Sequence, residues 1–183
     1  MDVIQEVLLI VLDLIKVVLL ALPLIFGAIF RTFFPRKLKD VHGQTVLITG
    51  GGNGLGRALA LEFATRGCTV IVVDIDRAAA EQTCTELRRK QVAAYAYRVD
   101  VSSYEQVEAM AFDVQKTIGP VDILVNNAGL VHFNFLEDTS TDIANRVIDI
   151  NVKSHIWTTK VFLEKMMDRK RGHIVAISSM SGM

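Results

Sequence analysis

Short apolar segments alternate with amphipathic segments from residue 45 onward, and this alternation limits the folds open to the chain more than any other feature. The apolar segments predict buried strands at residues 45–49, 68–74, 93–100, 121–126 and 173–178. The segments between them predict helices at residues 55–66, 77–90, 104–118 and 141–169. Strands and helices that alternate in this way form a parallel sheet with helices on both faces. We therefore expect an α/β, doubly wound domain over residues 44–183.

The first 34 residues are almost wholly apolar and account for much of the mean hydropathy of +0.36. On a helix, their first polar side chains fall within one arc of about 100°: Asp2, Gln5, Glu6, Asp13 and Lys16. The charge-free run 17–30 would be about 21 Å long at ~1.5 Å per residue, which is shorter than a hydrocarbon core of about 30 Å. A spanning helix would therefore bring Asp13 or Lys16 into the bilayer unless the two side chains pair or reach the interface.

Three interpretations of residues 1–34 compete: a cleavable signal peptide, a buried helix of the globular domain, and a membrane anchor. The segment lacks a basic N-terminal region and is longer than a signal peptide. We expect a membrane anchor, either a single span or a monotopic helix or hairpin broken near Pro23 and Gly27. A basic linker follows at residues 35–43, and basic residues on this flank favour a cytosolic position for the C-terminal domain. These residues are Arg31, Arg36, Lys37 and Lys39.

The charges of the chain balance, with 20 lysines and arginines against 20 aspartates and glutamates. Neither a strongly basic nucleic-acid-binding protein nor an acidic disordered tail has this balance, so we expect no nucleic-acid partner. The two cysteines, Cys68 and Cys84, form neither a disulfide framework nor a C-x-x-C site, and they fit a reducing, cytosol-facing compartment. The four histidines lack the spacing of metal ligands, so we expect no metal site.

A glycine-rich loop separates the first predicted strand from the first predicted helix. Its glycines let the backbone turn tightly and approach a pyrophosphate, while the helix N-terminus offers free N–H groups. The spacing is T-G-x3-G-x-G rather than the commoner G-x-G-x-x-G, and such a loop is weak evidence unless other motifs accompany it. The candidate cofactor-binding residues of this loop are Thr49, Gly50, Asn53, Gly54, Leu55 and Gly56.

Asp74 ends the second predicted strand, 18 residues after Gly56. A carboxylate at this position can accept hydrogen bonds from both adenosine ribose hydroxyls, each worth about 1.5–3 kcal/mol. It would repel a 2′-phosphate, and no basic residue replaces Asn53 to offset the repulsion, so NAD is favoured over NADP. Arg77 is close enough to leave NADP as an alternative, and capping of the next helix is the other interpretation of Asp74.

Two further motifs follow strand ends. Asp100 and Val101 end the third predicted strand, where an adenine edge would lie, although Asp100 could equally precede a helix cap at Ser102 or Ser103. The fourth strand ends in an Asn-Asn-Ala-Gly turn whose small residues would let the backbone and a ribose pack closely. An ordinary loop is the alternative for this turn. Its candidate cofactor-binding residues are Asn127, Ala128 and Gly129.

These motifs, together with Asn151 and the run at residues 172–179, resemble the short-chain dehydrogenase/reductase family over residues 43–183. The anchor segment and the run at residues 151–160 are similar to its membrane-anchored retinol dehydrogenase and 17β-hydroxysteroid dehydrogenase type 11/13 group. The resemblance implies a Rossmann fold and hydride transfer between NAD(P) and a small lipophilic alcohol or ketone, such as retinol, a steroid or a fatty alcohol. It also implies an endoplasmic reticulum membrane or lipid droplet location, with a homodimer in the full-length form.

The resemblance further implies a catalytic set of Asn, Ser, Tyr and Lys. Asn151 and Ser179 match the Asn and the Ser, although Asn151 could be a polar residue satisfied within its helix and Ser179 an ordinary strand-end serine. The Tyr and Lys belong to a Tyr-x-x-x-Lys sequence, which does not occur in the 183 residues. The residues four positions after Tyr95, Tyr97 and Tyr104 are Val99, Val101 and Glu108.

The predicted domain has five strands, whereas a doubly wound dinucleotide-binding fold has about six. We therefore expect an incomplete Rossmann domain that is truncated before Tyr-x-x-x-Lys and is inactive as residues 1–183 alone. The rival hypothesis is a truncated, catalytically inactive membrane protein that retains at most nucleotide or partner binding.

Overall fold

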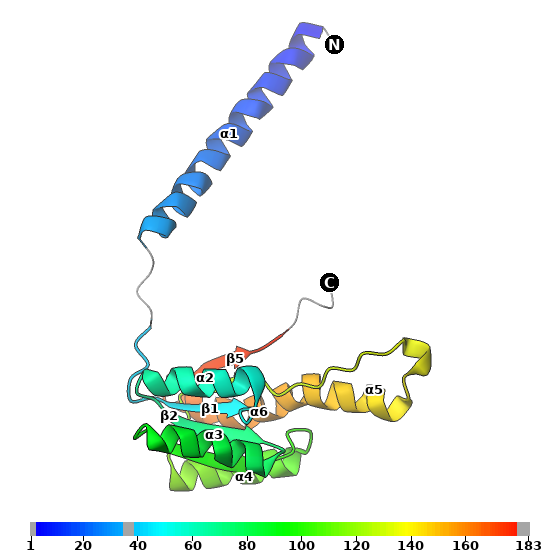
Figure 1. Ribbon diagram of the computed structural model, residues 1–183. Coiled ribbons are helices and arrows are strands. Elements are labelled where there is room, and N and C mark those ends of the chain that lie inside the picture. Colours follow the sequence, from blue (N-terminus) through cyan, green and yellow to red (C-terminus); the bar gives the residue numbers. More distant parts are fainter. Residues whose placement is uncertain (1–2, 35–38, 179–183) are drawn as a thin grey trace. The chain divides into compact units, whose positions relative to one another are not determined.

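The computed structural model describes residues 3–34 and 39–178 and divides the chain into two units after Asp40, within the predicted linker (Figure 1). Within the described residues of the first unit the structure has one helix, α1, Val3–Phe33. It is continuous through Pro23, so the break expected of a hairpin does not form there. Lys16 pairs with Asp13 at 3.1 Å, which is the mutual pairing that would lower the cost of placing both charges in a bilayer.

By length and composition, α1 could cross a membrane over Gln5–Phe30, and none of that window is buried within the structure. A signal sequence satisfies the same criterion, so α1 alone is weak evidence for an anchor.

The second unit is built on a five-stranded sheet with the order β3-β2-β1-β4-β5. Every neighbouring pair is parallel, with Val46 of β1 opposite Val70 of β2 and Leu47 of β1 opposite Leu124 of β4. This confirms the expected α/β class with a parallel sheet. The strands are β1 Thr45–Thr49, β2 Thr69–Asp74, β3 Ala94–Arg98, β4 Ile123–Asn126 and β5 His173–Ala176.

Helices cover both faces of this sheet because successive side chains of each strand point to opposite sides. Val46 and Ile48 belong to one buried cluster, which also includes residues of α2 and α3. Leu47 lies between them in sequence and belongs to the other cluster, with residues of α4 and α6. The helices are α2 Gly54–Thr65, α3 Arg77–Arg89, α4 Tyr104–Thr117, α5 Thr141–Ile148 and α6 Ser154–Asp168.

The prediction of a single helix at residues 141–169 is wrong in one respect, because a π-helical turn, Asp149–Lys153, separates α5 from α6. Its wider hydrogen-bonding pattern adds a residue to the turn and rotates the positions that follow. A single helix over residues 141–169 would place Ile143, Val147, Ile150, Ser154, Trp157 and Val161 on one side. The residues that α6 buries are Ser154, Thr158, Phe162 and Met166, with Trp157 and Val161 packed only partly against the same core.

Asp122 joins the amino ends of β1 and β4 and is only 8% exposed. Its Oδ2 accepts a hydrogen bond from the Thr45 N–H at 3.1 Å, and its Oδ1 accepts one from Arg169 at 2.9 Å and pairs with Arg171 at 3.3 Å. This network closes the amino edge of the sheet. The opposite, carboxyl edge is where the loops after β1, β2, β3 and β4 meet.

Candidate functional site

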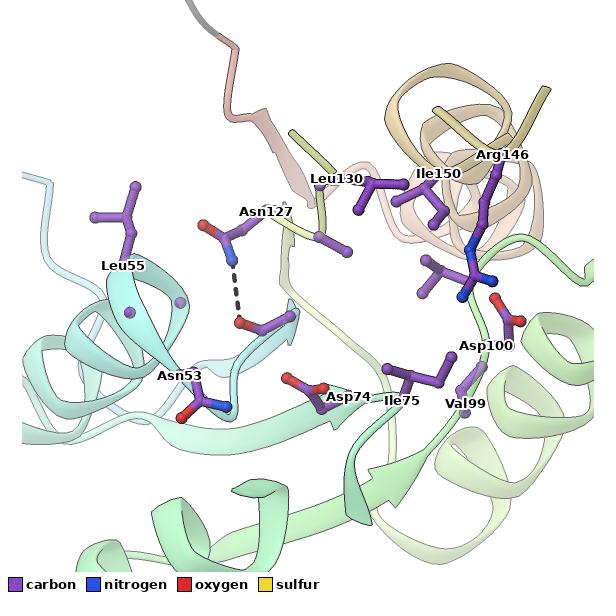
Figure 2. A pocket seen from close by; sticks show the side chains of 16 residues that line it. Asn53, Leu55, Asp74, Ile75, Val99, Asp100, Asn127, Leu130, Arg146 and Ile150 are labelled. Carbon is purple, nitrogen blue, oxygen red and sulfur yellow. Dashed lines mark hydrogen bonds between the residues drawn. The ribbon is translucent and has the colours of Figure 1, made fainter. Parts of the chain in front are cut away.

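A cavity of about 520 Å³ lies at the carboxyl edge of the sheet (Figure 2). It is lined by the loops after β1 to β4 and by residues of α5 and the π-helical turn. Most of the predicted cofactor-binding residues line it: Gly50, Asn53, Gly54, Leu55, Gly56, Asp74, Asp100, Val101, Asn127, Ala128 and Gly129. The fold therefore brings together predicted residues that are up to 79 positions apart in the sequence, from Gly50 to Gly129.

At Gly50 and Gly56 the glycine loop approaches the rest of the site so closely that a side chain would not fit. A Cβ on Gly56 would lie 2.1 Å from the Gly50 carbonyl oxygen and 2.5 Å from Nδ2 of Asn127. Gly50 has a φ of +64°, which favours glycine. Asn53 caps α2 with extended backbone and makes no side-chain capping bond, so it satisfies none of the first-turn N–H groups of α2. The loop is therefore a backbone cradle of the kind that suits a phosphate group.

Thr49 holds this cradle against the turn after β4 but is not one of the residues that line the cavity. Its buried hydroxyl accepts hydrogen bonds from the N–H groups of Asn127 and Ala128, both at 3.0 Å, and donates to the Val125 carbonyl at 3.4 Å. The Asn127 Nδ2 donates in return to the carbonyl oxygens of Thr49 at 3.0 Å and Gly50 at 3.2 Å, and Figure 2 shows the second of these bonds. We call this set of bonds the Thr49–Asn127 seam.

Asp74 points its carboxylate toward the cavity from the end of β2 (Figure 2). Its Oδ2 accepts a hydrogen bond from the Gly52 N–H at 2.9 Å, and its Oδ1 accepts one from the Asp76 N–H at 3.0 Å. Each carboxylate oxygen can accept more than one bond, so both retain capacity for a ligand. The side chain of Asp76, not of Asp74, caps α3 by accepting from the N–H groups of Ala78 and Ala79.

Asp100 lies in the turn between β3 and α4. Its Oδ1 accepts hydrogen bonds from the Ser102 N–H at 3.0 Å and the Ser102 hydroxyl at 2.6 Å. Ser103 supplies the cap of α4 through the Gln106 N–H. Asp100 therefore shapes the turn before α4 and also lines the cavity, and the neighbouring Val101 is mostly buried in the core.

Asn151 lies in the π-helical turn and bonds outside its own helix. Its Oδ1 accepts from the Leu130 N–H at 2.7 Å and its Nδ2 donates to the Leu130 carbonyl at 2.8 Å. The interpretation of Asn151 as a residue satisfied within its helix is therefore wrong. Both ends of the amide fix the segment that follows the β4 turn, which places this segment and the helix at one wall of the cavity.

Ser179, the other predicted catalytic residue, lies outside the described residues. Among the residues that the structure describes, no group of three histidines, cysteines or acidic residues could hold a metal ion.

Sequence reasoning missed several residues that line the cavity: Ile75, Val99, Leu130, Arg146 and Ile150. Ile75, Val99 and Leu130 are immediate neighbours of predicted residues, so extending each motif by one position would have found them. Ile150 belongs to the mostly apolar side of the helix predicted at residues 141–169, so its pattern gives no sign of a binding role, and nothing in the sequence pattern singles out Arg146.

The sequence pattern of the short chain dehydrogenase family matches residues 44–183. The chain is 37% identical over 170 residues to human 17-beta-hydroxysteroid dehydrogenase 13, covering 91% of this chain and 57% of that protein. It is 40% identical over 157 residues to human epidermal retinol dehydrogenase 2, covering 85% of this chain and 51% of that protein. The chain therefore spans little more than half the length of these relatives.

Solved structures agree with this assignment. NAD⁺-bound xylitol dehydrogenase matches with a TM-score of 0.75 and 34% identity, over 79% of this chain and 56% of that one. A metagenomic short-chain oxidoreductase in complex with NADP matches with a TM-score of 0.75 and 29% identity, over 79% of this chain and 66% of that one.

The fold and the cradle at the carboxyl edge define a Rossmann-type nucleotide-binding domain. The chain belongs to the short-chain dehydrogenase/reductase family of oxidoreductases, with retinol and steroid dehydrogenases among its relatives. Both expectations, of family and of fold class, are confirmed. The structural neighbours include one NAD and one NADP complex, so they support a nicotinamide cofactor without separating the two.

Proposed function

We propose that residues 44–183 form the cofactor-binding part of a membrane-associated oxidoreductase that transfers a hydride between NAD(P) and a small lipophilic alcohol or ketone. Retinol, a steroid and a fatty alcohol are the substrate types that the relatives' names and an apolar N-terminal helix suggest. The observation that carries the proposal is the single cavity that joins the glycine cradle, Asp74, Asp100 and the β4 turn.

The residues at this cavity fit a dinucleotide. The missing side chains of Gly50 and Gly56 let the loop close on itself and on the turn after β4, which leaves a compact backbone cradle suited to a pyrophosphate. The acceptor capacity of Asp74 suits the adenosine ribose diol. When bound, the nicotinamide would supply the site that accepts or donates the hydride. The chain's own residues bind and orient: the cradle holds phosphates, Asp74 holds the ribose, and Asn151 positions the wall at Leu130.

We propose NAD as the preferred cofactor because a carboxylate at Asp74 repels a 2′-phosphate. Arg77, the nearby cation, is exposed and is not among the residues that line this cavity. The test compares Asp74→Asn with the unmutated chain by calorimetric titration of NAD and NADP. Asparagine keeps one oxygen acceptor for the Gly52 N–H and removes the charge, together with the second acceptor that bonds the Asp76 N–H. Without the charge, NADP should gain affinity relative to NAD. Equal affinities of the unmutated chain for both cofactors would contradict the preference.

We further propose that residues 1–183 bind nucleotide but do not turn over substrate. The family mechanism needs a tyrosine tuned by a lysine as its acid–base group, and no Tyr-x-x-x-Lys sequence occurs in these residues. The assay is NADH formation from retinol, a steroid and a fatty alcohol by the detergent-solubilised chain, beside a longer version that carries Tyr-x-x-x-Lys. Equal rates would refute this proposal. A longer version without activity would favour the rival hypothesis of an inactive nucleotide-binding membrane protein.

The membrane association proposed for residues 1–34 rests on the length, apolar composition and exposure of α1. Deleting residues 1–34 should move the protein from a carbonate-resistant membrane pellet to the soluble fraction. The proposed location is the endoplasmic reticulum membrane or a lipid droplet with the domain facing the cytosol, so protease added to intact microsomes should digest the domain. Carbonate-resistant pelleting of the deleted form would rule out residues 1–34 as the anchor. A homodimer remains our expectation for the full-length form.

A further inference from the structure

Arg146 contributes the one cation among the described residues that line the cofactor cavity. The other charged side chains at this cavity, Asp74 and Asp100, are acidic. Arg146 is exposed and makes no hydrogen bond or ion pair within the described part of the chain. An exposed arginine with no protein partner, facing a ligand cavity, has its whole guanidinium available to a ligand.

The position of Arg146 follows from the helix that carries it. Arg146 lies in α5 and Ile150 in the π-helical turn that follows it directly, and both line the cavity. The paired hydrogen bonds between Asn151 and Leu130 hold this turn against the cavity wall. The side chain is therefore delivered to the cavity by a fixed element and not by a free loop.

Figure 2 shows which end of the cavity Arg146 occupies. Asn53 and Leu55 of the glycine cradle lie on one side of the view, whereas Arg146 points down from the other side toward Asp100. Asp74 lies between the two ends. A dinucleotide with its phosphates in the cradle and its ribose at Asp74 would therefore place its purine at the end where Arg146 lies.

The chemistry of this end suits a flat, uncharged aromatic ring. Its walls include the apolar side chains of Ile75, Val99 and Ile150, and Asp100 offers an acceptor for an exocyclic amino group. A guanidinium is planar and weakly hydrated, and it stacks on the π face of aromatic rings, including nucleobases.

We propose that Arg146 is a further cofactor-binding residue that closes over the adenine ring of the bound dinucleotide and stacks on it. The proposal rests on the proposed function, since it requires a nicotinamide dinucleotide in this cavity. Adenine is common to NAD, NADP and AMP, so Arg146 would raise affinity for all three without selecting among them.

The test is calorimetric titration of the detergent-solubilised chain, residues 1–183, with NAD, NADP and AMP. Arg146→Ala should weaken all three by the same factor, about three- to fivefold, the size expected of a cation–π contact at an exposed site. Arg146→Lys keeps the charge without the planar group and should lose part of this affinity. Arg89→Ala removes an exposed arginine of α3 that does not line the cavity and should change nothing.

Three results would overturn the inference: unchanged affinities of Arg146→Ala, a loss confined to NADP, or a loss that disappears at high salt. The last two would indicate a contact to phosphate instead of adenine. Failure of the unmutated chain to bind any of the three ligands would refute the proposed function itself, which is a separate result. Because Arg146 is exposed, the thermal unfolding of Arg146→Ala should match that of the unmutated chain, and this comparison guards against a folding effect.

Discussion

The Thr49–Asn127 seam allows a prediction whose size follows from the structure. Thr49 is only 2% exposed, and its hydroxyl accepts hydrogen bonds from two backbone N–H groups at 3.0 Å. Thr49→Val keeps the shape of the side chain and removes this hydroxyl. Each buried donor left without an acceptor costs about 1–3 kcal/mol. Asn127 and Ala128 are half-buried, so water can partly replace the lost oxygen, and we expect a total near the low end, about 2 kcal/mol. For a domain of this size that loss lowers the Tm by about 6–8 °C.

The assay is thermal and urea unfolding of the detergent-solubilised chain, with Thr49→Ser as the matched control. Serine keeps the hydroxyl and loses one buried methyl group, which costs about 1 kcal/mol. The expected order of stability is Thr49, then Thr49→Ser, then Thr49→Val. A valine variant at least as stable as the serine variant would refute the reasoning, because it would show that the hydroxyl contributes less than the methyl group.

Three further predictions follow from other contacts. Gly56→Ala should abolish nucleotide binding, because its Cβ would lie 2.1 Å from the Gly50 carbonyl oxygen, and calorimetry measures the loss. In thermal unfolding, Gly54→Ala is the matched comparison for stability: its Cβ meets no protein atom within 4 Å, so it should cost only about 1 kcal/mol of backbone strain at its positive φ. Burial raises the pKa of the Cys84 thiol from its ordinary 9.0 to about 11. The contribution of the protonated thiol to the free energy of unfolding is therefore complete below pH 9 and falls as the pH rises toward 11. Cys84→Ala should flatten this part of the pH dependence measured by urea unfolding. Asp122→Asn should lower the urea midpoint, because the Arg169 bond at 2.9 Å loses its charged acceptor, and an unchanged midpoint would contradict this.

The strands were predictable because each is an apolar run that ends in a turn residue or a polar motif. The run at 45–49 became β1, Thr45–Thr49, without change, since the polar segment with Gly43 precedes it and the glycine loop follows it. The run at 68–74 lost one residue, because the Cys68 N–H bonds the Phe63 carbonyl at the end of α2 instead of joining the sheet.

The site was predictable wherever a motif follows a strand, since parallel strands bring their carboxyl ends to one edge. Asp74 and Asn127 were found in this way. The contribution of α5 to the site was not predictable. The π-helical turn that rotates the helix leaves no trace in a pattern of apolar residues that repeats about every 3.6 residues. Arg146 then reads as an ordinary charge on a solvated helix face, and the bond between Asn151 and Leu130 joins residues 21 positions apart without any sequence pattern.

The parallel pairing of β1 with β4 also sets the order in which the chain can fold during synthesis. The Thr49 hydroxyl meets the Asn127 N–H across 78 positions of sequence, whereas β1 can pair with β2 after only 24, as Thr45 opposite Thr69. At about 5–20 residues per second, the ribosome needs roughly 4–16 s to make the residues between Thr49 and Asn127. During that interval the edge of β1 that later pairs with β4 has no strand partner, so the nascent chain exposes an aggregation-prone strand edge. A chaperone would have several seconds in which to bind this edge before β4 does.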